Sequence, residues 1–188
     1  TELNDYLAQL GAEQKLVLLE QNDNRVYIAQ SGLMGRNGPD ASAQRPRYQV
    51  SGFEFEMADD ADQLAVDLIL TEENGVKITK RFNFTRGKYL VGVEYLIENG
   101  SDQPWQASLF GQIKRDRSED PSSQTSMGMQ SYLGPAFSSP ENPYTKYSFD
   151  DIDDGKYADK VQGGWVVMLQ HYFVSAWVPN PEKSHNYF

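Results

Sequence analysis

The stretch of sequence that decides the fold is GGWVVMLQHYFVSAWVP, residues 163–179, which holds two of the three Trp and no charged side chain. In a chain with a formal net charge of -10, so apolar a segment must be buried or form a contact surface. Its paired Gly, its period-two ending and the final Pro179 favour a strand, a turn at residues 170–172 and a second strand. We expect most of this stretch to be sandwich core, with Trp165 and Trp177 buried against opposing strands.

Outward from this stretch, most of the chain alternates apolar and polar side chains between short turn signals, which predicts an all-β sandwich with little helix. The runs separated by the shortest turns predict three consecutive strands that form an antiparallel meander. The expected strands are residues 15–20, 25–30, 48–56, 64–70, 76–85, 89–98 and 105–114.

Two segments interrupt this pattern. Residues 31–46 carry three Gly and two Pro, and a loop of that length in a compact domain is often functional. Residues 115–126 are first charged and then Ser-rich, so we expect a mobile loop there.

The composition narrows the class of protein. A length of 188 residues and 39% hydrophobic residues fit one β-sandwich domain, residues 1–188, with a real core. Twenty-seven acidic against seventeen basic residues exclude nucleic acid as an expected partner. No window has the apolar length of a membrane span, and the absence of Cys excludes disulfides and thiolate chemistry. Because the chain starts at Thr1, we expect a trimmed domain rather than a whole protein.

No pattern points to catalysis. His171 and His185 are the only imidazoles, and neither belongs to a spacing that ligates zinc. A lone His in an apolar stretch is more often structural than catalytic. The acidic run 150–155 fails the ligand register of a calcium loop, so we expect a solvated acidic turn. There is no motif for a serine or cysteine nucleophile.

Other candidate residues are equally plain. Gly32, Gly35 and Gly38 precede no helix, so they predict no phosphate cradle. Two glycosylation sequons, at Asn83 and Asn99, are common by chance. Five cations are too dispersed among acids to form a basic patch: Arg81, Arg86, Lys114, Arg115 and Arg117. We therefore expect no catalytic, cofactor-binding or metal-ligating residues, and no cofactor, while the sequence names no partner-binding residue.

Four segments in collinear order resemble one known family. They are residues 27–40 (YIAQSGLMGRNGPD), 110–114 (FGQIK), 134–147 and, above all, 163–179. They resemble the large periplasmic (P1) domain of the YidC family, the membrane protein insertases of Gram-negative inner membranes. The resemblance implies a β-supersandwich similar to galactose-mutarotase-like sugar-binding domains.

The same resemblance implies a non-catalytic interaction domain at the periplasmic face of the inner membrane, soluble itself but tethered through the full-length protein. It would assist insertion and folding of inner-membrane proteins, and its implied partners are Sec translocon accessory subunits and nascent membrane proteins. The family's domain extends beyond both ends of this chain. A missing flanking strand would expose a sheet edge, and exposed edges recruit partners.

Two alternatives remain open. The first is a carbohydrate-binding or mutarotase-like protein that uses the sandwich cleft, which requires a concave site with an exposed aromatic ring and a convergent carboxylate. His171 pointing into such a cleft beside an acid would favour an enzyme. The second alternative is a purely structural spacer.

Overall fold

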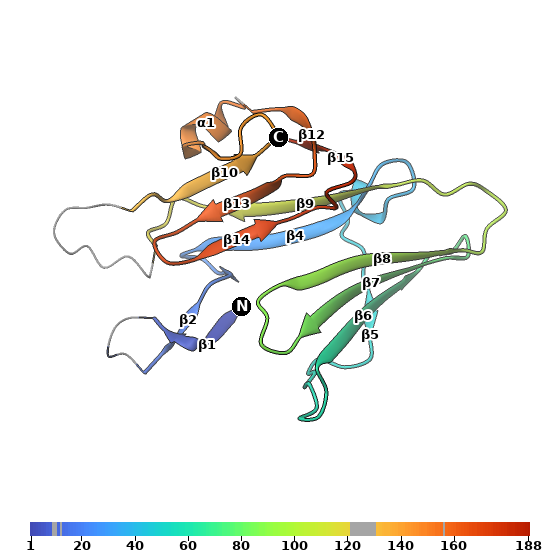
Figure 1. The fold of residues 1–188 in the computed structure, drawn as a ribbon. Coiled ribbons are helices and arrows are strands. Elements are labelled where there is room, and N and C mark those ends of the chain that lie inside the picture. Colours follow the sequence, from blue (N-terminus) through green and yellow to red (C-terminus); the bar gives the residue numbers. More distant parts are fainter. Residues whose placement is uncertain (9–10, 12, 121–130, 156) are drawn as a thin grey trace. The chain divides into compact units, whose positions relative to one another are not determined.

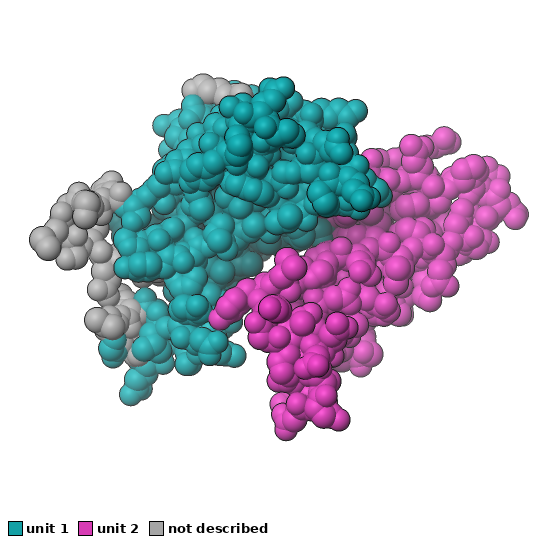
Figure 2. Space-filling view, in the orientation of Figure 1, with its two compact units in different colours: residues 1–31, 111–188 teal, residues 32–110 magenta. Residues whose placement is uncertain are grey.

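The computed structural model describes residues 1–8, 11, 13–120, 131–155 and 157–188 (Figure 1). Among these residues the secondary structure is almost entirely strand, with one 3-10 turn (Pro39–Ala41) and one short helix, α1 (Phe149–Asp153). The predicted all-β class is confirmed. The chain forms two compact units, residues 1–31 with 111–188 and residues 32–110, coloured separately in Figure 2.

The unit of residues 32–110 is built on a four-stranded antiparallel sheet. Its order is β5-β6-β7-β8, with the strands β5 (Gln49–Val50), β6 (Gln63–Thr71), β7 (Val76–Thr85) and β8 (Val91–Asn99). Tight turns after β6 and β7 connect neighbours, so the predicted meander is confirmed. Pairing is continuous from Gln63 opposite Thr85 to Thr71 opposite Lys77.

The core of this unit lies at one end of the sheet. Leu33, Val76 and Ile78 are buried, and five partly buried side chains pack on them: Tyr48, Leu70, Tyr95, Trp105 and Ala107. Val76 and Ile78 lie two residues apart on β7 and therefore share a face.

The predicted loop 31–46 is wrong in its first residues, because β4 (Val26–Met34) continues through them. The Asp40 carboxylate accepts a hydrogen bond from the Leu33 backbone N–H at 2.8 Å and holds the loop against the strand. A Cβ on Gly32 would lie 2.6 Å from that carboxylate, and one on Gly38 would lie 2.3 Å from the Leu33 carbonyl oxygen. The glycines here permit close packing.

The predicted strand 48–56 is wrong beyond Val50. Only Gln49 and Val50 pair, opposite Ile69 and Leu68 of β6. The Phe and Glu alternation suits a strand, but a strand also needs a neighbour for its backbone. The chain leaves β6 after Val50, and Phe53 is fully exposed. In the segment that follows, backbone carbonyl groups accept hydrogen bonds from the Arg86 guanidinium. The donor–acceptor distances are 2.6 Å to the Ala58 oxygen and 2.9 Å to the Ala61 oxygen.

The other unit contains several smaller antiparallel sheets. Strands β1 (Glu2–Leu7) and β2 (Lys15–Val17) pair, as do β12 (Asp159–Gln162) and β15 (Ser184–Tyr187). A four-stranded sheet has the order β11-β10-β13-β14, with β10 (Gly134–Ser138), β11 (Thr145–Lys146), β13 (Trp165–Leu169) and β14 (Val174–Trp177). A fourth sheet has the order β3-β4-β9, with β3 (Glu20–Gln21) and β9 (Ser108–Arg115) flanking β4.

The core of this unit is aromatic. Phe137, Val161 and Tyr187 are buried, and the partly buried Tyr147, Tyr157 and Val166 pack on them. The Phe137 ring stacks on Tyr157 at 4.4 Å between centroids and meets Tyr147 edge-on at 5.4 Å. Such aromatic pairs contribute beyond their buried area.

The stretch 163–179 folds as predicted into strand, turn and strand. The turn is closed by the Gln170 backbone N–H, which donates to the Phe173 carbonyl at 2.8 Å. The expected burial of both Trp is only half right, since Trp165 and Trp177 are each half-buried. Trp177 lies over Gly111, where a Cβ would come within 2.9 Å of its ring, and its indole N–H donates to the Gln112 carbonyl at 3.0 Å. This polar end keeps the ring at the margin of the core.

The acidic run 150–155 is not a simple turn, which corrects the prediction. It forms most of α1, whose N-terminus has a capping box between Ser148 and Asp151. The Arg117 guanidinium pairs with Asp150 and Asp153, each at 2.6 Å. Among the residues that the structure describes, no group of acidic or His side chains could hold a metal ion.

Of the expected mobile loop 115–126, Arg115 is the last residue of β9, and residues 121–126 lie outside the described residues. Asp116 accepts hydrogen bonds from the Val26 backbone N–H at 2.7 Å and from the Ser118 backbone N–H at 3.1 Å. The beginning of the segment is therefore tied to β4 and is not a free loop.

Candidate functional site

Strand β8 ends the β5-β6-β7-β8 sheet, and no described strand pairs with its outer side (Figure 1). Edge strands carry a row of unpaired backbone donors and acceptors that can accept another strand. With nine residues, β8 is a long edge. Its side chains alternate between an apolar face with Val93 and Ile97 and a polar face with Glu94 and Glu98.

Charged side chains form ordered rows across the polar face. In one row, Asp67 of β6 lies opposite Arg81 of β7, which lies opposite Glu94. The Arg81 guanidinium binds the Asp67 carboxylate through two hydrogen bonds of 2.7 Å, and this contact holds the pKa of Asp67 below its usual value. Glu94 adds to the negative field at Arg81. The signs in the row alternate, and the row ends on β8 with a carboxylate.

A second row repeats the outer two positions of the first, with Thr71 of β6 in place of a carboxylate. Lys77 lies opposite Glu98, and the Lys77 ammonium is 2.7 Å from the Glu98 carboxylate. Between the two charged rows lies Leu96, which is 42% exposed. The edge therefore presents carboxylate, apolar side chain and carboxylate at every second residue.

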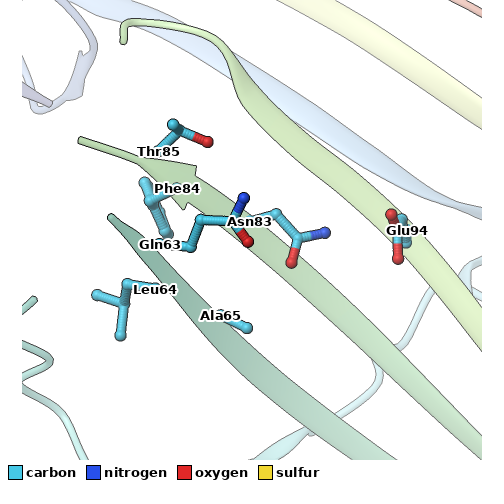
Figure 3. Close-up of a pocket in the computed structure, with 7 residues that line it drawn as sticks. All are labelled: Gln63, Leu64, Ala65, Asn83, Phe84, Thr85 and Glu94. Carbon is cyan, nitrogen blue, oxygen red and sulfur yellow. The ribbon is translucent and has the colours of Figure 1, made fainter. Parts of the chain in front are cut away.

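A hollow of about 510 Å³ adjoins the first row (Figure 3). It is lined by Gln63, Leu64, Ala65, Asn83, Phe84, Thr85 and Glu94. The register explains it, because Asn83 lies between Ala65 and Gly92 and neither neighbour has a long side chain. Two amide side chains and one carboxylate therefore share a concave surface beside the sheet edge.

A second hollow of about 480 Å³ lies in the same unit and is lined by Arg36, Asn37, Gly38, Pro39, Glu72, Glu73 and Asn74. The hydrogen-bonding groups of Asn37 are already used within the fold. Its side-chain oxygen accepts from the Gln106 backbone N–H at 2.9 Å, and its own backbone N–H donates to the Gln106 carbonyl at 3.1 Å.

Comparison with known proteins identifies the family. The family model described as the YidC periplasmic domain matches residues 1–188. This chain belongs to the YidC periplasmic domain family. Its location is therefore the periplasmic side of the bacterial inner membrane.

Three relatives, each named membrane protein insertase YidC, illustrate the similarity. The protein of Marinobacter nauticus is 42% identical over 97% of this chain and 33% of its own length. That of Saccharophagus degradans is 49% identical over 93% and 31%. That of Pseudomonas putida strain W619 is 51% identical over 90% and 30%. The chain thus spans about a third of the length of these YidC relatives. Within its described residues, no helix has the length and apolar character needed to cross a bilayer.

His171 occupies the turn between β13 and β14 of this YidC domain, and it lines neither hollow. Its Nδ1 is hydrogen-bonded with the Ser131 hydroxyl. The nearby Asp120 is buried, but its carboxylate accepts from the His171 backbone N–H at 2.9 Å and from the Gln170 side-chain amide at 3.0 Å. Both carboxylate oxygens thus bind amide groups. His185 is in β15, where its Nε2 lies 3.0 Å from the Asn180 carbonyl. This geometry favours structural roles for both His.

A buried charged cluster of the YidC domain escaped the sequence reasoning. Arg25 and Arg115 lie over the ring of the fully buried Tyr27, at 5.5 and 5.0 Å from its centroid. Arg25 is paired with Glu20 at 2.7 Å and donates to the Val17 carbonyl at 3.1 Å. Burial, and then the nearby Arg25, lower the pKa of Arg115. Since the two Arg are far apart in sequence, only strand pairing reveals that they are neighbours.

Proposed function

We propose that this chain is a non-catalytic docking module of a membrane protein insertase. In this proposal it contacts Sec translocon accessory subunits or nascent membrane proteins, and the insertion activity resides in the rest of the protein. Family membership supports the insertase context, since relatives that carry this domain are named membrane protein insertases. The chain is about a third of their length, which fits an accessory role.

The observation that carries the docking role is the long edge strand β8. It combines a strand edge with no described neighbour, an exposed apolar residue at Leu96 and carboxylates that end both charged rows. The surroundings of His171 support the same proposal, because the Asp120 carboxylate accepts hydrogen bonds from the His171 backbone N–H and the Gln170 side-chain amide, contacts that hold the turn between β13 and β14.

Photocrosslinking in membranes tests the docking role. A photoreactive amino acid is placed in the full-length insertase at Leu96, at Tyr172 or, as a buried control, at Ile78. We expect adducts with a Sec accessory subunit or a nascent chain from at least one exposed position and none from Ile78. Insertion of a model membrane protein is measured in parallel with a variant that lacks this domain. Loss of contact with retained insertion assigns the domain to docking.

Two negative results together would contradict the docking role. If no exposed position gives an adduct and insertion is unchanged without the domain, the domain is a spacer and the proposal is wrong.

The hollow at Glu94 favours carbohydrate binding as a second candidate function. Gln63, Asn83 and Glu94 supply the amides and the carboxylate that bind sugar hydroxyl groups. Sugar-binding sites also use an aromatic ring. Phe84 is the aromatic residue that lines this hollow, but it follows Asn83 on β7, so its side chain belongs to the opposite face of the sheet. Titration with monosaccharides and oligosaccharides, followed by amide NMR shifts at residues 63–65 and 83–85, tests this candidate. Shifts that disappear in Glu94→Ala would support it.

A further inference from the structure

We propose that the outer edge of β8 binds an extended segment of a partner protein whose sequence has two basic residues four positions apart with apolar residues between them. The segment would add a fifth strand to the β5-β6-β7-β8 sheet. This inference rests on the docking function proposed above and specifies the surface and the chemistry of the partner.

The backbone of β8 provides the first argument. Addition of a strand to a sheet edge gains affinity from main-chain hydrogen bonds, and the alternating side chains give specificity. Among the described strands, none continues the sheet beyond β8. Side chains along this edge are accessible on both faces, with Val91 38% exposed, Leu96 42% and Ile97 36%.

The charged rows define the polar face of the incoming strand. Across the sheet the first row reads Asp67, Arg81 and Glu94, so the next position in an alternating row is a cation. In the second row the cation Lys77 is followed by Glu98, and the next position is again a cation. Opposite charges on directly facing residues stabilise strand pairs, and like charges destabilise them.

The register then fixes the spacing. Glu94 and Glu98 are four residues apart on one face, so the residues that oppose them are also four apart, whether the incoming strand is parallel or antiparallel. The three residues between face Tyr95, Leu96 and Ile97, which favours apolar side chains at all three positions. The recognition sequence is basic, three apolar residues and basic.

The hollow beside Glu94 provides room for the basic side chain of the partner that faces Glu94. It lies at the row of Asn83, where Gly92 has no side chain. A Lys or Arg opposite Glu94 can therefore extend over Gly92 and donate to the Glu94 carboxylate and toward the amide oxygen of Asn83. This is an environment that binds a cationic head group without burying it unpaired.

A second copy of this chain is a poorer occupant. Two paired β8 strands would bring four carboxylates, Glu94 and Glu98 of each copy, onto one face and would add no cation at the interface. The formal net charge of -10 opposes self-association further. Carboxylates on an edge strand are also a common means of preventing such self-pairing.

A peptide-binding experiment with the full-length insertase that contains this chain tests the proposal. The probe is a fluorescein-labelled peptide with the core Lys-Val-Ile-Val-Lys between Ser and Gly flanks, and a second peptide has Glu at both Lys positions. Fluorescence anisotropy measures binding to detergent-purified protein. We expect the Lys peptide to bind at least about tenfold more tightly than the Glu peptide. Backbone amides of β8 should gain protection from hydrogen exchange when it binds.

Charge reversal supplies the decisive comparison. In the double variant Glu94→Lys and Glu98→Lys, the preference should invert, so that the Glu peptide binds more tightly than the Lys peptide. The matched control changes two exposed acids away from this sheet, Glu141→Lys and Glu182→Lys, and should keep the original preference. Circular dichroism of each variant verifies that the fold is intact.

Three outcomes would overturn the inference. They are no binding of either peptide, binding that the double variant leaves unchanged, and outward-facing β8 amides that are already protected in the free protein because another strand occupies the edge. If photocrosslinks to Sec subunits persist in any of these cases, the docking function stands and only the assigned surface is wrong. If the crosslinks are also absent, both proposals fail.

Discussion

The β13–β14 hairpin and the strand β8 use the same two-residue alternation in opposite ways. In the hairpin both faces are apolar, with Val166 on one and Val167 on the other, and the outer strand β14 has only four residues. In β8 one face is apolar, the other carries carboxylates, and the edge is nine residues long. Short edge strands resist pairing with other chains, and long ones invite it. An apolar signature on both faces thus marks the framework, whereas the carboxylates of the long edge mark the surface that we propose as a docking site.

The largest expected effect is on the free energy of unfolding, and it compares the same Phe-to-Ala substitution at a buried site and at an exposed site. Phe137→Ala empties a buried aromatic cluster and should lower the free energy of unfolding by about 3–5 kcal/mol. Phe53→Ala removes the same ring where it is fully exposed and should change it by less than about 0.5 kcal/mol. Urea denaturation followed by tryptophan fluorescence measures both. Similar losses at the two sites would show that the Phe137 cluster is not the framework of its unit.

The second effect concerns the buried charges of the hairpin's own unit. Arg25→Met leaves Glu20 without its cation and should lower the free energy of unfolding by about 2–4 kcal/mol. Arg117→Met is the control, since its pairs with Asp150 and Asp153 are exposed and should contribute little. Thermal unfolding monitored by circular dichroism distinguishes the two. A tolerated Arg25→Met would mean that the cluster at Tyr27 does not hold β3 and β4 together.

The contrast between these two regions also explains which strands could be predicted from the sequence and which could not. The meander was predictable because β6, β7 and β8 alternate regularly between short turns, and β7 begins at Val76 and ends at Thr85 as expected. The run 48–56 alternates just as well, yet only two of its residues pair, because a strand also depends on a neighbour that local patterns do not reveal.

Site residues depend even more on register. Glu94 looks like any solvated acid until pairing places it beside Arg81, and Arg25 and Arg115 meet only through Tyr27. The acidic run 150–155 gave the wrong local structure, because the capping box of Ser148 and Asp151 stabilises a helical turn that is too short to show a periodic stripe.

A third effect depends on pH. Hydrogen bonds from the Ser118 hydroxyl, and then from the backbone N–H groups of Val26 and Ser118, hold the pKa of Asp116 below its usual value. A carboxyl whose pKa is lower in the folded state stabilises the fold above the unfolded-chain pKa of about 3.9, and this contribution is lost as the pH falls through the folded pKa. Asp116→Asn should therefore cost about 1 kcal/mol at pH 7 and progressively less below pH 4.

Urea denaturation of both proteins at several pH values from 7 to 2.5 measures this difference. A gap between wild type and Asp116→Asn that stays constant across the range would show that the ionised carboxylate is not what ties residue 116 to β4.

The variant with the smallest expected effect on stability gives the most specific test of peptide binding at the β8 edge. Glu98→Gln removes an ion pair with Lys77 in which the two side chains are 67% and 42% exposed, so the free energy of unfolding should change by less than about 0.5 kcal/mol. If the edge binds a basic strand, the same variant should weaken the Lys peptide by about two- to fivefold, because one of the two facing charges is gone. Thr71→Val, next to Lys77 on the inner side of the same row, leaves the edge charge in place and should not affect binding. A loss of stability with unchanged binding would make Glu98 part of the framework, like the hairpin, and not of the docking surface.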